Sequence, residues 1–300
     1  MKVALSGASG FIGRHVLAEL TRHDIPPVVI LRPNADVPDF LRQHRIVRID
    51  IANAGPDAYA QVGCPDVLIH LAWGGLPNYW SLHHFERELP AHYAFLKGLV
   101  VTGLPHLVVS GTCFEYGMQS GPLREDLPTS PANPYGLAKD SLRRQLEQLR
   151  RLHPFSMAWA RLFYLHGRAQ PPGSLLPLLS SAVERGDTVF PMSGGQQLRD
   201  YLDVAEAARH LVALALEARD VGVINVCSGR PVSVRRLVEG WIEEHAWSIK
   251  PALGCHPYPN HEPMAFWGDR SKLDGLPARA TSKSTQKCRG PQPLSTMTQR

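Results

Sequence analysis

The chain has 300 residues, of which 44% are hydrophobic and 20% charged, the composition of an ordinary globular protein. Its formal charge of +5 comes from the segment after Asp274, which has no acidic residue and five basic ones: Arg279, Lys283, Lys287, Arg289 and Arg300. The remainder is neutral, which argues against a nucleic-acid-binding surface.

Cysteine, histidine and apolar patterns exclude further classes. The five cysteines are scattered without CxxC spacing, which indicates reduced thiols in a cytosol. The 14 histidines lack the HxH or HExxH spacing of metal ligands, so no metal site is expected. Glycine interrupts the apolar N-terminus at once, unlike a signal peptide, and no run of about 18 apolar residues occurs. We expect a cytoplasmic protein without a membrane span.

Short apolar runs alternate with helical patterns along the first half of the chain. Strands are expected over residues 2–6, 28–31, 46–49, 67–71, 107–110 and 156–163. Helices are expected over residues 11–22, 91–101 and 135–152. This alternation predicts an α/β fold built on a doubly wound parallel sheet of the Rossmann type.

Three glycines lie between the first expected strand and the first expected helix: Gly7, Gly10 and Gly13. A tight turn, a close approach of backbone N–H groups to a pyrophosphate and close helix packing each exclude a β-carbon. A βα turn without a ligand could use the same glycines, but their place before a helix favours a dinucleotide. We expect the turn to contact the cofactor through Gly7, Gly10, Phe11, Ile12 and Gly13.

Residues at the ends of the next strands bear on the choice of cofactor. Arg32 stands where an acid would hold the ribose of NAD, so it favours NADP through the 2′-phosphate. NAD remains the alternative, because an arginine at a strand end is often simply solvated. Asp50 and Ile51 are candidates for the adenine edge, with a plain turn as the other interpretation. Leu71 and Ala72, at the end of the strand over 67–71, complete the expected cofactor contacts.

Tyr135 and Lys139 begin the helix expected over 135–152. A spacing of four residues puts both side chains on one helical face. A phenol with a pKa of about 10 is a poor acid-base catalyst at neutral pH, but a neighbouring ammonium group stabilises the phenolate and lowers that pKa. The pair by itself could also be an exposed surface pair, so the pattern needs a third member.

The third member is Thr112, which follows a strand at the carboxyl edge of the expected sheet, where open α/β folds bind ligands. The segments GASGFIG, SGTCFEYG and PANPYGLAK resemble the nucleotide-sugar branch of the extended short-chain dehydrogenase/reductases, the NAD-dependent epimerase/dehydratase family. The resemblance covers roughly residues 1 to 275. It implies an NAD(P)-dependent oxidoreductase acting on a CH–OH group of a nucleotide sugar.

The resemblance also implies a role for each of the three residues. Tyr135 would donate or accept the proton at the sugar oxygen, and Thr112 would hydrogen-bond that oxygen. Lys139 would bind the nicotinamide ribose and tune Tyr135. Because all three are present, they argue against the alternative from another class, a non-catalytic NAD(P)-sensing scaffold.

The residues after Thr112 separate branches of the family. The 4,6-dehydratases place Asp and Glu there, whereas this chain has Cys113 and Phe114, so dehydration is disfavoured. The 3,5-epimerase/reductases carry their cysteine base at the position of Phe114, so Cys113 is better interpreted as a small buried thiol. Two reactions remain, the reduction of a 4-keto-6-deoxyhexose and 4-epimerisation with tightly bound NAD. Arg32 favours reduction, because such reductases tend to use NADP.

The stretch WGGLPNYWSLHHFERELPAHYAFLKGLV strengthens this choice. It resembles bacterial dTDP-4-dehydro-6-deoxyhexose reductases, including those that form dTDP-6-deoxy-L-talose and dTDP-fucose. The resemblance implies a place in making deoxysugar donors for polysaccharide or a glycosylated metabolite. His83 and His84 within the stretch are interpreted as a solvated loop pair.

A second lobe is expected after the strand over 156–163, because proline and glycine become frequent there. Arg199 resembles the family's arginine that meets the nucleotide diphosphate, with Tyr201 nearby, and a surface ion pair with Asp203 is the alternative. Ser174 and Leu175 occupy a stretch where relatives often carry Asn-Leu against the nucleotide.

These observations divide the chain into three parts. Residues 1–165 are the expected dinucleotide-binding domain. Residues 166–276 are mainly a smaller substrate-binding lobe, with part of the chain returning to the main domain. Residues 277–300 are expected to be a disordered or non-native tail. The helix over 135–152 forms a homodimer interface in many relatives, so a homodimer is possible here.

Overall fold

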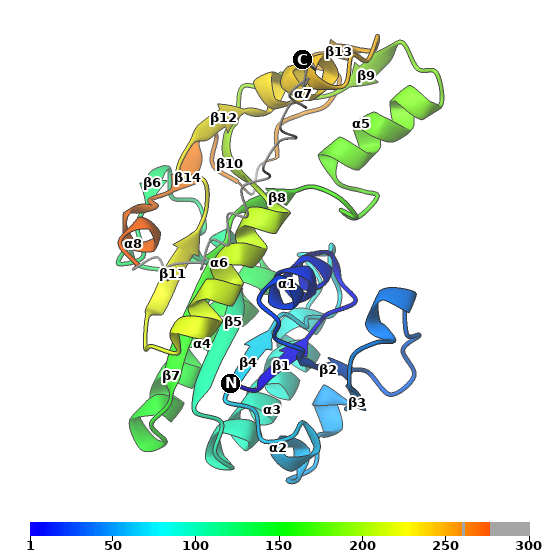
Figure 1. Cartoon of the computed structure of the whole chain (residues 1–300). Coiled ribbons are helices and arrows are strands. Elements are labelled where there is room, and N and C mark those ends of the chain that lie inside the picture. The colour runs from blue at the N-terminus through cyan, green and yellow to red at the C-terminus, as the bar shows by residue number, and fades with distance from the viewer. Residues whose placement is uncertain (260–261, 277–300) are drawn as a thin grey trace, which may run out of the picture.

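The computed structural model describes residues 1–259 and 262–276. Its centre is a seven-stranded parallel sheet in the order β11-β7-β5-β4-β1-β2-β3 (Figure 1). The strands are β1 (Val3–Ser6), β2 (Val28–Leu31), β3 (Ile46–Arg48), β4 (Val67–His70), β5 (His106–Thr112), β7 (Ser156–Leu162) and β11 (Gly222–Val226). The predicted α/β fold with a doubly wound parallel sheet is therefore confirmed.

Four long helices cover the two faces of this sheet: α1 (Phe11–Arg22), α3 (Leu89–Val101), α4 (Pro134–Leu152) and α6 (Val204–Glu217). Helices α1 and α6 pack together over one face, and α3 and α4 cover the other. Successive strand residues point to opposite faces, so Leu5 joins the core under α1 and α6 while Ala4 joins the core under α3 and α4. Burial on both faces explains why the central strands are continuous apolar runs.

The smaller lobe has its own sheets and core. Its strands form three short sheets, β12-β10-β8, β13-β9 and β14-β6. Their bounds are β6 (Gly121–Leu123), β8 (Tyr164–His166), β9 (Val189–Pro191), β10 (Leu198–Asp203), β12 (Pro231–Ser233), β13 (Lys250–Ala252) and β14 (Phe266–Gly268). The helices of this lobe are α5 (Leu175–Glu184) and α7 (Val234–Glu244), which lie together with β9 and β13 in Figure 1. Buried Leu179, Phe190, Val238 and Trp241 fill the space between them. The short helix α8 (Ser271–Asp274) instead packs against β11 of the large sheet, where Leu273 joins the core.

Several short elements join the larger ones. They are η1 (Asp39–Leu41), η2 (Ile51–Asn53), α2 (Ala58–Gln61), the π-helical turn η3 (His84–Glu88) and the 3-10 turn η4 (Cys113–Tyr116). The expected strand over 107–110 is longer than predicted, so Thr112 is the last residue of β5 and the N-cap of η4.

The chain leaves the large sheet after β7 and returns to it at β11. The domain division at residue 165 stays a prediction, and the tail expected over residues 277–300 lies outside the described residues. Within residues 1–259 and 262–276, no helix combines the length and apolar character needed to cross a bilayer.

Candidate active site

The turn between β1 and α1 has no room for a side chain at Gly7 or Gly13. Gly7 has a φ of +77°, and a β-carbon there would lie 2.7 Å from the backbone nitrogen of Ala72. A β-carbon on Gly13 would lie 2.0 Å from the carbonyl oxygen of Gly7. The turn thus packs directly against Leu71 and Ala72 at the end of β4. The first turn of α1 has no acidic residue and Gly10 offers no side-chain cap, so the N–H groups of this turn can donate hydrogen bonds to an anion.

The edge formed by β2 and β3 carries Arg32 and Asp50. Arg32 is exposed directly after β2. The guanidinium of Arg48, which the sequence interpretation missed, donates to the carbonyl oxygens of Arg32 (3.2 Å) and Pro33 (2.6 Å), so a second cation lies at this turn. The Asp50 carboxylate accepts hydrogen bonds from the Ala52 nitrogen (3.1 Å) and from Asn53 Nδ2 (2.7 Å). Asp50 therefore caps η2, which begins at Ile51.

Thr112, Tyr135 and Lys139 meet between the end of β5 and the start of α4. All three are buried, and the Thr112 side chain lies close enough to Tyr135 to favour its phenolate form and lower its pKa slightly against the effect of burial. The Asn133 side chain caps α4 by accepting from the Gly136 nitrogen (2.8 Å), which fixes the turn that carries Tyr135. Because α4 packs over β5, the helix brings the phenol and the ammonium group to the carboxyl edge of the sheet.

Burial controls the acid-base properties of this group. Burial, followed by the nearby Tyr79, raises the pKa of Tyr135 well above its usual range. Burial lowers the pKa of Lys139 to about 7, although the charges of Glu115 and Glu88 act in the opposite direction. Tyr135 is therefore a neutral phenol with a proton to give, and Lys139 can gain or lose its charge near neutral pH.

An aromatic shell that the sequence interpretation missed surrounds the ring of Tyr135. The ring centroids of Tyr79, His84, Trp73 and Phe114 lie 5.5, 5.2, 6.2 and 6.4 Å from that of Tyr135. Lys139 Nζ lies 4.2 Å from the centroid of the Trp73 ring. This shell keeps water from the phenol and stabilises the ammonium group through a cation–π contact.

The interpretation of His83 and His84 as a solvated pair is wrong for His84, which is fully buried. His84 Nδ1 accepts from Trp73 Nε1 (3.1 Å), so its Nε2 carries the proton and donates to the carbonyl oxygen of Asn78 (2.8 Å). The ring thereby ties the loop that contains Tyr79 to the catalytic residues. Its only signal in the sequence was an otherwise unexplained histidine near aromatic residues.

Buried polar side chains continue beneath the glycine turn. Ser6 Oγ, His70 and His92 are joined by contacts of 2.8 Å and 2.7 Å, and His92 Nε2 lies 3.1 Å from the Glu88 carboxylate. Burial lowers the pKa of His70 well below its usual range, and His92 and Lys139 add to that effect. Burial also lowers the pKa of His92, so the two histidines pack the cofactor end of the sheet without adding positive charge.

Arg199, in the smaller lobe, is buried, which contradicts the alternative of a surface ion pair with Asp203. It pairs with Glu262, with Arg199 Nη2 at 2.8 Å and Nε at 3.1 Å from Oε2. Asp203 instead caps α6 by accepting from the Ala205 nitrogen (2.7 Å). Tyr201 is two residues along β10 from Arg199.

Ser174 and Leu175 begin helix α5, away from β10 in the chain: Ser174 is its N-cap and Leu175 its first residue. Cys113 is buried, and burial raises the pKa of its thiol well above the usual range. No cluster of three or more His, Cys, Asp or Glu side chains suited to a metal occurs in the part of the chain that the structure describes.

The chain belongs to the NAD dependent epimerase/dehydratase family, whose model matches residues 3–227. It is 30% identical over 270 residues to dTDP-6-deoxy-L-talose 4-dehydrogenase (NAD(+)) of Aggregatibacter actinomycetemcomitans, covering 89% of this chain and 99% of that one. It is 27% identical to dTDP-6-deoxy-L-talose 4-dehydrogenase (NAD(P)(+)) of Kitasatospora kifunensis, over 81% and 79% of the two chains.

A solved structure is similar along the same length. MoeE5 in complex with UDP-glucuronic acid and NAD matches with a TM-score of 0.77 and 26% identity, over 91% of this chain and 92% of that chain. The family predicted from the three sequence segments is therefore confirmed. The roles of individual residues stay predictions.

Proposed function

We propose that the protein is a reversible nucleotide-sugar 4-dehydrogenase that reduces a 4-keto-6-deoxyhexose with NAD(P)H. The observation that carries this proposal is the buried contact between Thr112 and Tyr135 beside Lys139, at the carboxyl edge of the sheet. The turn between β1 and α1 fits a dinucleotide, because it is kept tight by two glycines. A β-carbon on Gly7 would collide with the backbone of Ala72, and one on Gly13 with the backbone of Gly7. Similarity to the two dTDP-6-deoxy-L-talose 4-dehydrogenases supports the substrate class.

The chemistry divides between cofactor and protein. Bound NAD(P)H supplies the hydride for the carbonyl carbon. Tyr135, neutral because it is buried, donates its proton to the sugar oxygen, and the Thr112 hydroxyl donates a hydrogen bond to the same oxygen. Lys139, held over the Trp73 ring, binds the nicotinamide ribose and stabilises the phenolate that remains. In the oxidation direction the same groups act in reverse.

We assign the cofactor and substrate contacts to the remaining predicted residues. The pyrophosphate lies on Gly7, Gly10, Phe11, Ile12 and Gly13, and the nucleotide diphosphate of the substrate on Arg199. Arg199 Nε and Nη2 donate to Glu262, and Nη1 donates to the carbonyl oxygens of Leu198 (2.8 Å) and Met264 (3.4 Å), so bidentate binding of a phosphate requires Arg199 to exchange Glu262 for the phosphate oxygens. Tyr201, Ser174 and Leu175 complete the expected substrate contacts, and Leu71, Ala72, Asp50 and Ile51 those to the cofactor.

A direct assay tests the reaction. The protein is mixed with NADPH or NADH and dTDP-4-keto-6-deoxyglucose, nicotinamide oxidation is followed, and the sugar product is identified. Consumption of nicotinamide with formation of a dTDP-6-deoxyhexose is expected. Interconversion of UDP-hexoses by protein that keeps NAD through gel filtration would establish the 4-epimerase alternative instead. Cofactor binding without turnover of any nucleotide sugar would establish a sensing scaffold.

Arg32 is proposed to favour NADP over NAD. We expect Arg32→Ala to lower kcat/KM for NADPH by about 10- to 100-fold, because a charge-assisted hydrogen bond to the 2′-phosphate contributes about 1.5–3 kcal/mol. The value for NADH should stay within about twofold, because NADH lacks that phosphate. Steady-state kinetics with both cofactors measure the ratio.

Arg42→Ala is the matched control for Arg32. Arg42 is exposed and pairs with the exposed Asp39 (3.0 Å), so its loss should leave kcat/KM for both cofactors unchanged. An unchanged NADPH/NADH ratio in Arg32→Ala would contradict the assignment and favour NAD.

A homodimer through α4 is proposed as well. Leu137 and Leu152 are exposed apolar side chains on this helix, with 46% and 78% of their surface accessible in the isolated chain. Sedimentation velocity of the wild-type protein and of Leu137→Glu tests the proposal, and a dimer lost in the variant is the expected result.

A further inference from the structure

Glu115 is a fully buried carboxylate three residues after the catalytic threonine. Its Oε1 accepts hydrogen bonds from the backbone nitrogen of Thr112 (2.9 Å) and from Trp159 Nε1 (2.9 Å). Its Oε2 accepts from Arg161 Nε (2.7 Å). Trp159 and Arg161 lie on β7, the neighbour of β5 in the sheet, so one carboxylate joins both strands at the edge where Thr112 lies.

The sheet leaves space for this arrangement at Gly111. A β-carbon there would lie 2.3 Å from Trp159 Nε1 and 2.7 Å from Glu115 Oε1. Gly111 stands opposite Arg161 in the register of β5 and β7. Any larger residue at this position would displace the carboxylate or the indole, so the backbone before Thr112 is shaped to admit Glu115.

Thr112 is consequently held at two points. Its amide donates to Glu115, while its Oγ1 accepts a hydrogen bond from the Phe114 nitrogen (3.3 Å). With its oxygen engaged as an acceptor, the hydroxyl hydrogen remains available for donation. The Thr112 side chain contacts Tyr135, so this hydrogen can be donated to an oxygen atom beside Tyr135.

We propose that Glu115 is a positioning residue that, by accepting the Thr112 amide, holds the Thr112 hydroxyl in the orientation that meets the sugar oxygen beside Tyr135. The inference rests on the proposed function of Thr112 and Tyr135. Arg161 balances the charge of Glu115 and stacks over the Tyr116 ring, 4.4 Å from its centroid. The buried ion pair thus fixes the carboxylate rather than serving the reaction itself.

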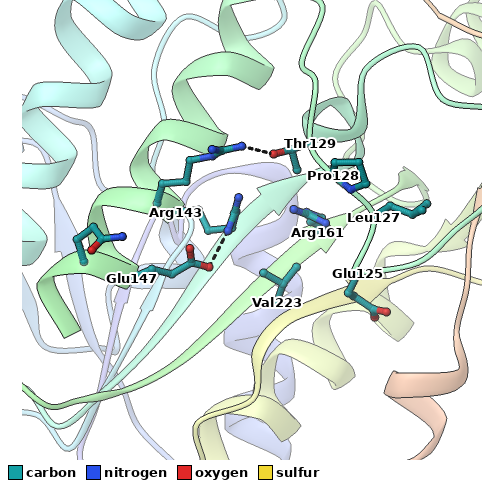
Figure 2. Close-up of a pocket in the computed structure, with 10 residues that line it drawn as sticks. Glu125, Leu127, Pro128, Thr129, Arg143, Glu147, Arg161 and Val223 are labelled. Atoms are coloured by element: carbon teal, nitrogen blue, oxygen red, sulfur yellow. Dashed lines mark hydrogen bonds and ion pairs between the residues drawn. The ribbon is translucent and has the colours of Figure 1, made fainter. Parts of the chain in front are cut away.

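Glu147, a second carboxylate near Arg161, is the matched control for Glu115. Arg161 and Arg143 line a pocket of about 390 Å³ together with Glu147 (Figure 2). Arg143 Nη1 donates to Glu147 Oε1 (2.6 Å), and Arg143 Nε lies 3.9 Å from Glu115 Oε2. Glu147 is therefore a carboxylate in the same charge network that is partly exposed and makes no hydrogen bond to Thr112 among those that the described residues form.

Two double variants separate the hydrogen bond to Thr112 from the ion pair. Both replace Arg161 by Met, with Glu115→Gln in one and Glu115→Leu in the other. Neither leaves a buried charge without a partner, which is the change most damaging to a fold. Gln keeps an oxygen that can accept the Thr112 amide, and Leu does not.

We expect kcat of E115L/R161M to lie about 30-fold or more below that of E115Q/R161M, because small misplacements at a reacting centre cost about 100-fold. The KM values for cofactor and nucleotide sugar should agree within about threefold, since Thr112 acts at the transition state. In a Thr112→Ala background the two variants should have equal kcat, because Glu115 acts through Thr112. Glu147→Gln should retain the wild-type kcat.

Three results would overturn the proposal: equal kcat of the two double variants with Thr112 present, a difference that persists without Thr112, or unfolding of the Leu variant alone. The last would make Glu115 a purely structural residue, and cofactor titration with thermal melting detects it. The comparison uses whichever nucleotide sugar the wild-type protein converts. A different substrate would then revise the proposed function and leave the test of Glu115 intact.

Discussion

Tyr135→Phe is expected to lower kcat for the reduction by about 10²- to 10⁴-fold, the usual contribution of a general acid. The ring would keep its packing against Tyr79 and His84, so the surrounding shell should not change. Burial keeps Tyr135 a neutral phenol at neutral pH, so it has a proton to donate. Phenylalanine has no hydroxyl group, so the variant loses this proton donor. Stopped-flow measurement of NAD(P)H oxidation with saturating nucleotide sugar gives the rate.

The dissociation constant for NAD(P)H should stay within about threefold in Tyr135→Phe, since the phenol meets the sugar oxygen rather than the phosphates. Tyr59→Phe is the control. Its hydroxyl donates to the carbonyl oxygen of Gly103 (3.1 Å) on the α3 side of the sheet, and kcat should not change. A Tyr135→Phe variant with wild-type turnover would remove Tyr135 from the chemistry and favour another proton donor.

Local patterns in the sequence predicted the parts of the fold whose causes are local. Alternating apolar runs predicted the central strands, because burial on both faces requires them to be apolar throughout. The three glycines predicted the turn between β1 and α1, because a β-carbon at position 7 would collide with the backbone of Ala72. The spacing of Tyr135 and Lys139 is likewise a property of one helix.

Partners that are distant in the chain could not be predicted this way. Glu115 meets Arg161 across 46 residues and Arg199 meets Glu262 across 63, and neither pairing has a spacing that a sequence pattern records. Asp203 was the acid that the sequence interpretation offered as a partner of Arg199, but it caps α6 instead. Single side chains can satisfy several local patterns, and only the packing of the strands decides among them.

The pKa of Lys139 is another property of the site that the sequence pattern could not predict. The pattern of Tyr135 and Lys139 predicts an ammonium group that lowers the pKa of the phenol. Burial lowers the pKa of Lys139 itself to about 7, although the Trp73 ring contacts its ammonium group. Glu115 and Glu88 act against that shift, so these two carboxylates favour the charged form of the ammonium group.

Gly13→Ala should weaken cofactor binding and raise the dissociation constant for NAD(P)H by about 100-fold or more. Its β-carbon would stand 2.0 Å from the carbonyl oxygen of Gly7, which is backbone and cannot rotate away. The turn would have to open, and the N–H groups at the start of α1 would no longer converge on the pyrophosphate. Overpacking of this kind also costs about 1–3 kcal/mol, so the melting temperature should fall.

Gly240→Ala separates this steric effect from the general effect of adding a methyl group to a helix. Gly240 lies in α7, and a β-carbon there would meet nothing within 4 Å. The variant should gain up to about 1 kcal/mol of stability, since alanine is the better helix former, and its cofactor binding should be unchanged. Fluorescence titration with NADPH and NADH measures both variants. Binding in Gly13→Ala within about threefold of the wild-type value would mean that the glycine turn does not hold the pyrophosphate.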